Sequence, residues 1–427
     1  MSPYSLTIQR TRGSLRQGLR FQADCHFQNP RQESVTLSSP STELRHHQPA
    51  YRVPGPPRST SVEPLQVTAA FHSIYLVHFA PTAAITPIGT TLDSVVVPVR
   101  TNADGSVTLV LRVSGRQLPT IKTRNEVGAM TWIRQNTTIP IPAIVRYDSN
   151  DQNVIGHEFT LLEKAPGKSI DQIYDTLSME ARTELVHQLA DYLVELHAHP
   201  WKEGYVGGLT LTDGEITQGP PIDEDFWKLP DLEKYWAGSE SLELLNPIPP
   251  QGFPNFVAFT VGCLDRYIHA IERHPSLESH RDLVPWIRAF AIAIQEPNNA
   301  DQLNQVAYVL AHKDLHFANI MCDPDHPDCP TTAVLDWEFN GVVPAPRWNP
   351  PRAFLRNMKW TPEDKEEQAR MEKLFESVCR EKGVGKVLEE MQLNALQQSM
   401  QTAVNHIRAI VEVCPRGQAS RPSCQLA

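Results

Sequence analysis

The sequence predicts an α+β fold in which a small β-sheet lobe with one helix precedes a larger, mostly helical lobe. Residues 95–99 and 108–113 are β-branched runs, and residues 102–105 between them form a turn that ends in Gly, which predicts a hairpin. Residues 122–136 predict a helix that ends before two prolines, and residues 159–162 predict another strand. These elements would make up the sheet lobe.

Leucines with helical spacing follow Gly167 and mark the second lobe. Four of them recur at steps of four, four and three residues, which places them on one face of a helix. They are Leu185, Leu189, Leu193 and Leu196. Further helices are expected near residues 257–273, 283–295 and 363–382. The second lobe is therefore predicted to be mostly helical.

Composition at the two ends, and strand and helix patterns between them, divide the chain into four segments: residues 1–67 as a disordered or targeting segment, 68–166 as the sheet lobe, 167–412 as the helical lobe and 413–427 as a loose tail. The first sixty residues contain eight Arg, no Lys and only three acidic residues. An Arg- and Ser-rich, acid-poor start is typical of a mitochondrial transit peptide. A disordered tail or a wrongly predicted first exon explains the same composition.

Overall charge and cysteine usage restrict the class of protein. The 427 residues carry 39 basic and 49 acidic side chains, a net charge of -10, which opposes binding to nucleic-acid phosphates. No apolar run approaches the ~20 residues that cross a bilayer. The seven cysteines are scattered, unlike those of a secreted disulfide framework. We expect a cytoplasmic protein, or a mitochondrial one if the first segment is a transit peptide, without a nucleic-acid partner or a membrane span. The oligomeric state stays open.

Two polar motifs at strand ends carry the candidate chemistry. In residues 312–319, H-K-D-L-H-F-A-N, Asn319 follows Asp314 by five residues, and Asp336 follows a strand-like run seventeen residues later. Phosphoryl transfer needs an acceptor hydroxyl aimed at the γ-phosphate and cations on the triphosphate. Asp314 suits a proton acceptor, and Asn319 and Asp336 suit oxygen ligands of Mg²⁺. Polar loops also arise by chance, but both motifs at this interval after a sheet lobe favour catalysis.

These motifs resemble a known family. The segments AHKDLHFANIM and VLDWEF look like the Brenner-type motif of the aminoglycoside phosphotransferase and choline kinase superfamily, in particular its fungal members. LVLRVSG, NEVGAMTWIRQNTTIPIPAIVRYD and HEFTLLEKAPG are similar to the family's cation-bearing strand, glutamate-bearing helix and hinge, so the resemblance covers roughly residues 85–355. It implies a two-lobed, protein-kinase-like fold and an ATP- and Mg²⁺-dependent phosphotransferase acting on a hydroxyl of a small-molecule acceptor.

The resemblance also assigns roles to single residues. Asp314 matches the catalytic base, and Asn319 and Asp336 match the Mg²⁺ ligands. His312 matches a position that braces the catalytic loop. The positions that it assigns to nucleotide binding are Gly89, Arg112, Glu126 and the hinge residues Glu163, Lys164 and Ala165.

Three features of the sequence depart from the family pattern. Arg112 stands where the kinase fold has a lysine, although an arginine can still hold phosphate oxygens and pair with Glu126. Gly89 is the single glycine of the nucleotide-covering loop, residues 86–94, which leaves fewer flexible backbone donors. Lys313 replaces a common glycine, and its side chain is expected to point to solvent.

Three weaker signals each have two interpretations. Cys322, His326 and Cys329, with His316 nearby, suggest zinc, or the Pro- and Asp-rich turn between two strands, which we favour. Residues 213–236 mix acids with aromatics, as a site for a cationic acceptor would, and as a solvated loop with a few core anchors would. Residues 344–351 either shape the acceptor pocket or form a rigid connector.

Two other functions compete with a small-molecule phosphotransferase. A nucleotide-binding pseudokinase or scaffold is supported by Arg112 and the Gly-poor loop, but the retained Asp314, Asn319 and Asp336 argue against it. A protein kinase would need a peptide groove and an activation segment ending in Ala-Pro-Glu, which the sequence lacks. The acceptor itself cannot be named, because the fold accommodates many substrates.

Overall fold

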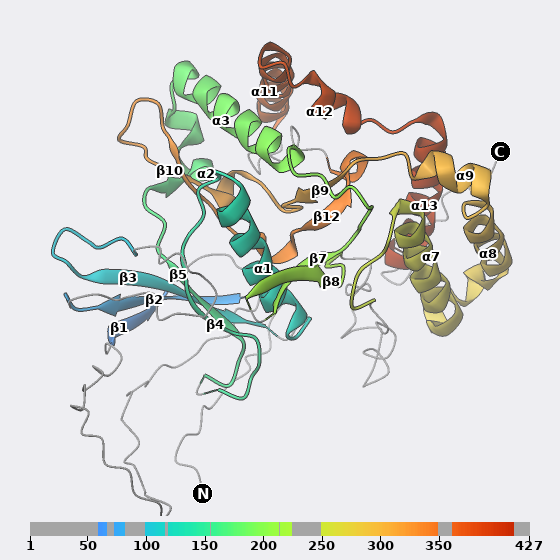
Figure 1. The fold of residues 1–427 in the computed structure, drawn as a ribbon, viewed down its shortest axis with the longest axis horizontal. Coiled ribbons are helices and arrows are strands. Elements are labelled where there is room, and N and C mark those ends of the chain that lie inside the picture. Colours follow the sequence, from blue (N-terminus) through green and yellow to red (C-terminus); the bar gives the residue numbers. More distant parts are fainter. Residues whose placement is uncertain are drawn as a thin grey trace, which may run out of the picture.

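The computed structural model describes residues 59–65, 72–81, 99–115, 118–153, 155–212, 214–223, 249–348 and 361–413. Figure 1 shows a sheet lobe, coloured blue to teal, beside a larger lobe in which helices dominate. The fold is thus the expected two-lobed α+β arrangement. None of the helices within these ranges combines the length and hydrophobicity that a membrane span requires. Gly89 with its loop and most of residues 213–236 lie outside the described residues, as do residues 95–98, 1–58 and 414–427.

The sheet lobe contains, in the described residues, an antiparallel sheet with the order β1-β2-β3-β5-β4. Its strands are β1 (Ser59–Pro64), β2 (His72–Phe79), β3 (Val107–Ser114), β4 (Ile144–Asp148) and β5 (Phe159–Glu163). The strands predicted at residues 108–113 and 159–162 are confirmed. The predicted start of the lobe at residue 68 was wrong, because β1 already pairs with β2.

The helix α1 (Ile121–Asn136) confirms the predicted helix and joins the two lobes. Its Gly128 lies so close to the second lobe that an added Cβ would stand 2.5 Å from the carbonyl oxygen of Leu209. The side chain of Asn125 donates to the carbonyls of Glu338 at 3.1 Å and Asn340 at 3.0 Å, and accepts from the Leu209 amide at 2.8 Å. These contacts fix α1 to the helical lobe.

The helical lobe forms one hydrophobic core. Its helices are α2 (Ile170–Ile173), α3 (Met179–His197), α7 (Phe256–Arg273), α8 (Val284–Ala293), α9 (Pro297–Leu303), α11 (Pro362–Glu381), α12 (Gly385–Glu390) and α13 (Ala395–Val413). The helices predicted near residues 257–273, 283–295 and 363–382 are confirmed. The predicted leucine face of α3 is buried, with each of its four leucines at most 1% exposed.

Short strands and turns of the helical lobe lie between its long helices and the sheet lobe (Figure 1). The strands are β6 (Lys168–Ser169), β7 (Gly208–Thr212), β8 (Glu215–Gly219), β9 (Tyr308–Ala311), β10 (Ile320–Cys322), β11 (Thr331–Val334) and β12 (Gly341–Pro344). The 3₁₀ turns are η1 (Tyr174–Thr176), η2 (Pro275–Leu283), η3 (Phe317–Asn319), η4 (Trp337–Phe339) and η5 (Ala345–Arg347). The hairpin β10–β11 and the pair β9–β12 carry both polar motifs.

Candidate active site

The loop between β9 and β10 holds the first motif. His312 lies at its start and is fully buried; its Nε2 donates to the carbonyl of Leu335 at 2.7 Å, and its ring lies 4.4 Å from that of Trp337. Burial lowers the pKa of His312 to about 4, so the ring is neutral at neutral pH. This geometry agrees with the expected bracing role, because the ring ties the loop to the residue before Asp336.

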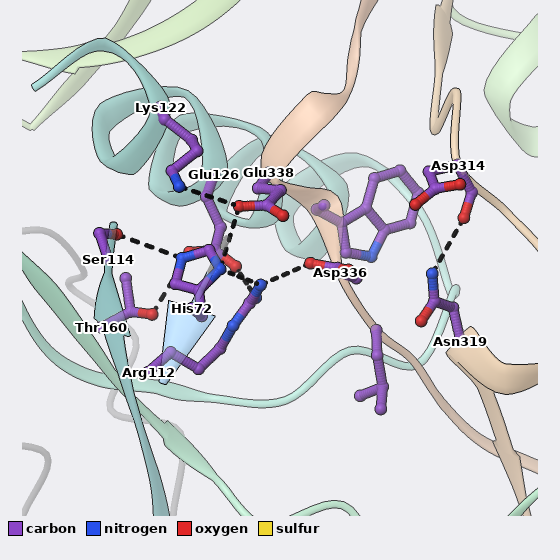
Figure 2. Close-up of polar contacts among 12 residues, drawn as sticks. His72, Arg112, Ser114, Lys122, Glu126, Thr160, Asp314, Asn319, Asp336 and Glu338 are labelled. Atoms are coloured by element: carbon purple, nitrogen blue, oxygen red, sulfur yellow. Dashed lines mark hydrogen bonds and ion pairs between the residues drawn. The ribbon is translucent and has the colours of Figure 1, made fainter. Parts of the chain in front are cut away.

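Asp314 is the exposed acid of this loop, with 53% of its side chain accessible. Beyond Asp314 the loop turns back on itself, since the side-chain amide Nδ2 of Asn319 donates to the backbone carbonyl oxygen of Asp314 at 2.9 Å (Figure 2). His316 approaches the Asp314 carboxylate at 4.0 Å from the same loop. The carboxylate is therefore open to a group arriving from solvent.

The β10–β11 hairpin brings Asn319 and Asp336 to the same end of the two strands. Ile320 pairs with Val334, and the Leu335 amide donates to the Asn319 carbonyl at 2.8 Å. Asp336 follows with a φ of 64°, a left-handed conformation that costs a non-glycine residue about 1–2 kcal/mol. A carboxylate and an amide oxygen suit Mg²⁺, which binds few protein oxygens and takes the rest from water and phosphate.

Arg112 joins the sheet lobe to this site. From the buried face of β3 its guanidinium contacts the Glu126 carboxylate of α1, and it also donates to Asp336 Oδ1 at 2.5 Å (Figure 2). Burial by itself would lower the pKa of Arg112, but Glu126 and Asp336 outweigh it and raise the pKa. The predicted pairing of Arg112 with Glu126 is present, and the contact with Asp336 adds to it.

A second buried ion cluster lies behind Arg112. Glu338, two residues after Asp336, meets Lys122 of α1 at 3.6 Å and His72 of β2 at 3.2 Å, and all three side chains are at most 3% exposed. Burial is the main cause of three pKa shifts in this cluster. It raises the pKa of Glu338 to about 8, and it lowers the pKa values of Lys122 and His72. Sequence reasoning missed Glu338 and His72. The spacing of Lys122 one helical turn before Glu126 marks only Lys122, and no local pattern points to Glu338 or His72.

Lys313 corrects one expectation. Its side chain does not point to solvent: Nζ donates to the Ile222 carbonyl at 3.2 Å and to Asp223 Oδ2 at 3.3 Å, and only 17% of the side chain is exposed. Burial would raise the pKa of Asp223, but Lys313 and then Arg347 outweigh it and lower the pKa. The physical reason is that the carbonyl of Ile222 and the carboxylate of Asp223, which follow β8, lie within reach of the ammonium group, and the backbone at Lys313 is left-handed, with a φ of 65°.

The expected hinge connects β5 to β6. The Glu163 carboxylate accepts from the backbone amides of Arg100 at 3.0 Å and Ala143 at 3.3 Å, so it stabilises the lobe itself. Lys164 is exposed and Ala165 partly buried. At Gly167, with a φ of 88°, an added Cβ would lie 1.9 Å from the carbonyl oxygen of Cys322. The hinge therefore runs directly against β10.

The zinc interpretation finds no support in the structure. Within the described ranges, no three His, Cys, Asp or Glu side chains are grouped to hold a metal ion. Residues 323–330 instead form the expected turn. In it the backbone amide of Cys329 donates to the carbonyl of His326, and the backbone amide of Asp323 donates to the carbonyl of Pro330. Of residues 344–351, the described part is the end of β12, η5 and the buried Trp348.

Comparison with known proteins decides the family. The model of the phosphotransferase enzyme family, APH, matches residues 84–345, which is more than half of the chain and includes Arg112, Glu126, Asp314, Asn319 and Asp336. The chain belongs to this family. The matched residues include both polar motifs at the strand ends.

Two curated relatives share about a quarter of the aligned residues with the chain. A Subtelomeric hrmA-associated cluster protein of Aspergillus fumigatus is 25% identical over 52% of this chain and 50% of the relative. The Clavilactone A biosynthesis cluster protein Y of Ampulloclitocybe clavipes is 26% identical over 56% of this chain and 58% of the relative. The chain thus spans about half the length of the curated relatives it matches.

Solved structures of aminoglycoside phosphotransferases are also similar to the chain. The streptomycin-ATP-APH(2")-IIa ternary complex aligns over 82% of this chain and 86% of that one, with 13% identity and a TM-score of 0.40. The gentamicin-APH(2")-IIa complex aligns over 81% and 91%, with 14% identity and a TM-score of 0.38.

Proposed function

We propose that this phosphotransferase transfers the γ-phosphate of ATP to a hydroxyl group of a small molecule. The observation that carries the proposal is that Asp314 contacts Asn319, that Asn319 and Asp336 lie at the same end of the β10–β11 hairpin, and that Arg112 of the other lobe contacts Asp336. An open carboxylate, two oxygen ligands and a buried cation are the parts that phosphoryl transfer needs.

Each of these residues has a distinct task. The exposed Asp314 orients the acceptor hydroxyl and takes its proton. Asn319 and Asp336 would hold Mg²⁺, which supplies positive charge to the phosphate oxygens when it is bound. Arg112 presents its guanidinium to the same oxygens while Glu126 keeps it in place. Backbone groups of Glu163, Lys164 and Ala165 are proposed to meet adenine, and Gly89 to lie in the loop over the phosphates.

The acids of residues 213–236 leave the charge of the acceptor open. Asp223, one of the acids expected to attract a cationic acceptor, is paired with Lys313. Its neighbours in residues 224–236 lie outside the described residues. The name of the relative from a clavilactone A biosynthesis cluster agrees with a small metabolite as acceptor. The scattered cysteines support a cytoplasmic location.

The competing function is a pseudokinase that binds nucleotide without transferring phosphate. A library of metabolites incubated with γ-labelled ATP should yield a labelled product if the enzyme is active. Asp314→Asn keeps the shape but removes the proton acceptor, so turnover should fall by about 10²–10⁴-fold while the ATP dissociation constant changes little. Full turnover in this variant would remove Asp314 from the catalytic role.

Mg²⁺ dependence tests the metal assignment separately. Calorimetric titration of ATP should show tighter binding with Mg²⁺ than without it, and Asp336→Ala should lose that difference because its carboxylate is the proposed anionic ligand. Asp323→Ala, which removes an acid from the far turn of the same hairpin, is the matched control and should keep the difference. Equal affinity with and without Mg²⁺ in the unchanged protein would contradict the assignment.

A further inference from the structure

Two cysteines face each other at the turn of the β10–β11 hairpin. Cys322 ends β10, Cys329 lies just before β11, and their Sγ atoms are 2.9 Å apart in a thiol–thiol hydrogen bond. Cys322 is fully buried and Cys329 is 3% exposed. A disulfide bond is about 2.05 Å long, so the two sulfur atoms are about 0.9 Å from bonding distance.

The backbone holds this approach in place. The Cys329 amide donates to the His326 carbonyl at 2.9 Å, and the Asp323 amide donates to the Pro330 carbonyl at 3.1 Å, which closes the turn on both sides. Cys329 has a φ of 43°, unusual for a residue with a side chain, and this conformation is compatible with its thiol lying next to Cys322. The closed turn therefore keeps the two cysteines next to each other.

We propose that Cys322 and Cys329 are a reversible oxidation site that forms an intramolecular disulfide with a low-molecular-weight disulfide, such as oxidised glutathione, as the oxidant. One thiol attacks the oxidant and releases a glutathione thiol, and the second thiol then displaces the other glutathione. The Sγ–Sγ bond forms and the glutathione S–S bond breaks. Two electrons pass from the cysteine sulfurs to the glutathione sulfurs, and the two thiol protons end on the two released glutathione molecules.

Burial sets the rate of this reaction. It raises the pKa of Cys322, as does the neighbouring Cys329 thiol, so little thiolate is present at neutral pH. The oxidant also has to reach a sulfur that the closed turn covers, which requires the turn to open. Oxidation of the folded protein is therefore slow, over minutes to hours, and the disulfide is equally shielded from reductants afterwards.

The position of the pair gives the cross-link a structural consequence. The same hairpin carries Asn319 and Asp336 at its other end, and the Cys322 carbonyl packs against the hinge at Gly167. Closing the turn covalently restricts the unfolded chain, so the oxidised protein should melt a few degrees higher. This inference does not depend on the proposed function, because neither thiol takes part in phosphate transfer.

Peptide mapping tests the proposal on the full chain. Trypsin cuts after Lys313 and Arg347 and leaves both cysteines in one peptide, residues 314–347. After treatment with oxidised glutathione at about pH 8, near the pKa of a free thiol, this peptide should be two hydrogens lighter and resist iodoacetamide. Acid cleavage of the Asp323–Pro324 bond should leave its two halves joined until a reductant is added.

Internal controls separate this site from the other thiols. Cys263 and Cys379 are buried in α7 and α11 and should remain reduced. Cys329→Ala should give no joined halves and no difference in melting temperature between oxidised and reduced protein. The proposal is overturned if iodoacetamide still alkylates both Cys322 and Cys329 after the folded protein has been treated, and again after the protein has been unfolded and refolded in a glutathione mixture. That result would leave the phosphotransferase assignment unaffected.

Discussion

Nη2 of Arg112 lies 2.5 Å from Oδ1 of Asp336, although 224 residues separate them in the chain. One residue belongs to the central strand of the sheet lobe and the other follows the hairpin of the helical lobe. Since Arg112 also contacts Glu126 on α1, a single guanidinium connects three elements (Figure 2). The expected phosphate cation and the expected metal ligand thus belong to one ion cluster.

Replacing Arg112 should weaken nucleotide binding. Arg112→Ala removes charge-assisted hydrogen bonds worth about 1.5–3 kcal/mol each, so the ATP dissociation constant should rise by about 10–100-fold. Arg112→Lys keeps the charge but loses the planar fork, and should recover part of the affinity. Calorimetry on samples shown to be folded by thermal melts measures both effects. Arg124→Ala, at an exposed arginine of the same helix, is the control, and an unchanged affinity in Arg112→Ala would place the phosphate contact elsewhere.

The Lys122–Glu338 pair should contribute mainly to stability. Both side chains are at most 3% exposed. Above its pKa of about 8 Glu338 is charged, and Lys122→Met then leaves a buried carboxylate with less compensation, which costs about 3–5 kcal/mol. Adding Glu338→Gln should restore part of that loss, because a neutral amide needs no counter-charge. Urea unfolding of the unchanged protein, Lys122→Met, Glu338→Gln and the double variant at that pH measures the coupling free energy between the two residues. The surface pair of the exposed Lys386 with the partly buried Glu390 provides the comparison, and Lys386→Met should change stability by less than about 1 kcal/mol.

The left-handed backbone at Lys313 allows a test that separates strain from charge. Lys313→Ala and Lys313→Gly both remove the ion pair with Asp223, but only glycine adopts a φ of 65° without cost. The glycine variant should therefore be about 1 kcal/mol more stable than the alanine variant, while both are less stable than the unchanged protein. The midpoints of urea unfolding measure the order of stability of the three proteins. Equal midpoints for the two variants would show that the loop relaxes around alanine.

Much of the sheet lobe, and the grouping of the motif residues at the candidate site, could be predicted from the sequence because their signals are local. The β-branched run of β3, the proline-terminated α1 and the motif spacing of Asp314, Asn319 and Asp336 each lie within a short stretch. Strand β1 was missed because it is short, lies next to Arg-rich sequence and is recognised only through its pairing with β2.

Long-range ion pairs were beyond the reach of local patterns. Nothing near Lys313 indicates that Asp223, ninety residues earlier, would take its ammonium group. Glu338 has the same difficulty, since its partners come from β2 and α1. Lys313 was expected to face water and Glu338 was given no role, and the structure buries both with distant partners.

His312 makes part of the folding stability dependent on pH. Its neutral ring is buried against Trp337, and its Nε2–H donates to Leu335, so charging the ring would place an uncompensated cation in the core. Burial lowers the pKa of His312 to about 4, below the ~6.5 of an unfolded histidine, so between these values the unfolded chain binds more protons. Stability therefore falls as pH drops through this window.

The expected loss from His312 alone is about 3 kcal/mol between pH ~6.5 and ~4, since each unit of pKa shift corresponds to about 1.4 kcal/mol. His312→Gln keeps an amide donor for the Leu335 carbonyl but cannot take up a proton, so its urea midpoint should fall less over the same pH window than that of the unchanged protein. Other groups titrate equally in both proteins, and the difference between the two curves isolates His312. His406→Gln, at an exposed histidine of α13, should leave the curve unchanged. Parallel curves for the His312 variant and the unchanged protein would mean that the ring is already accessible to protons in the folded state.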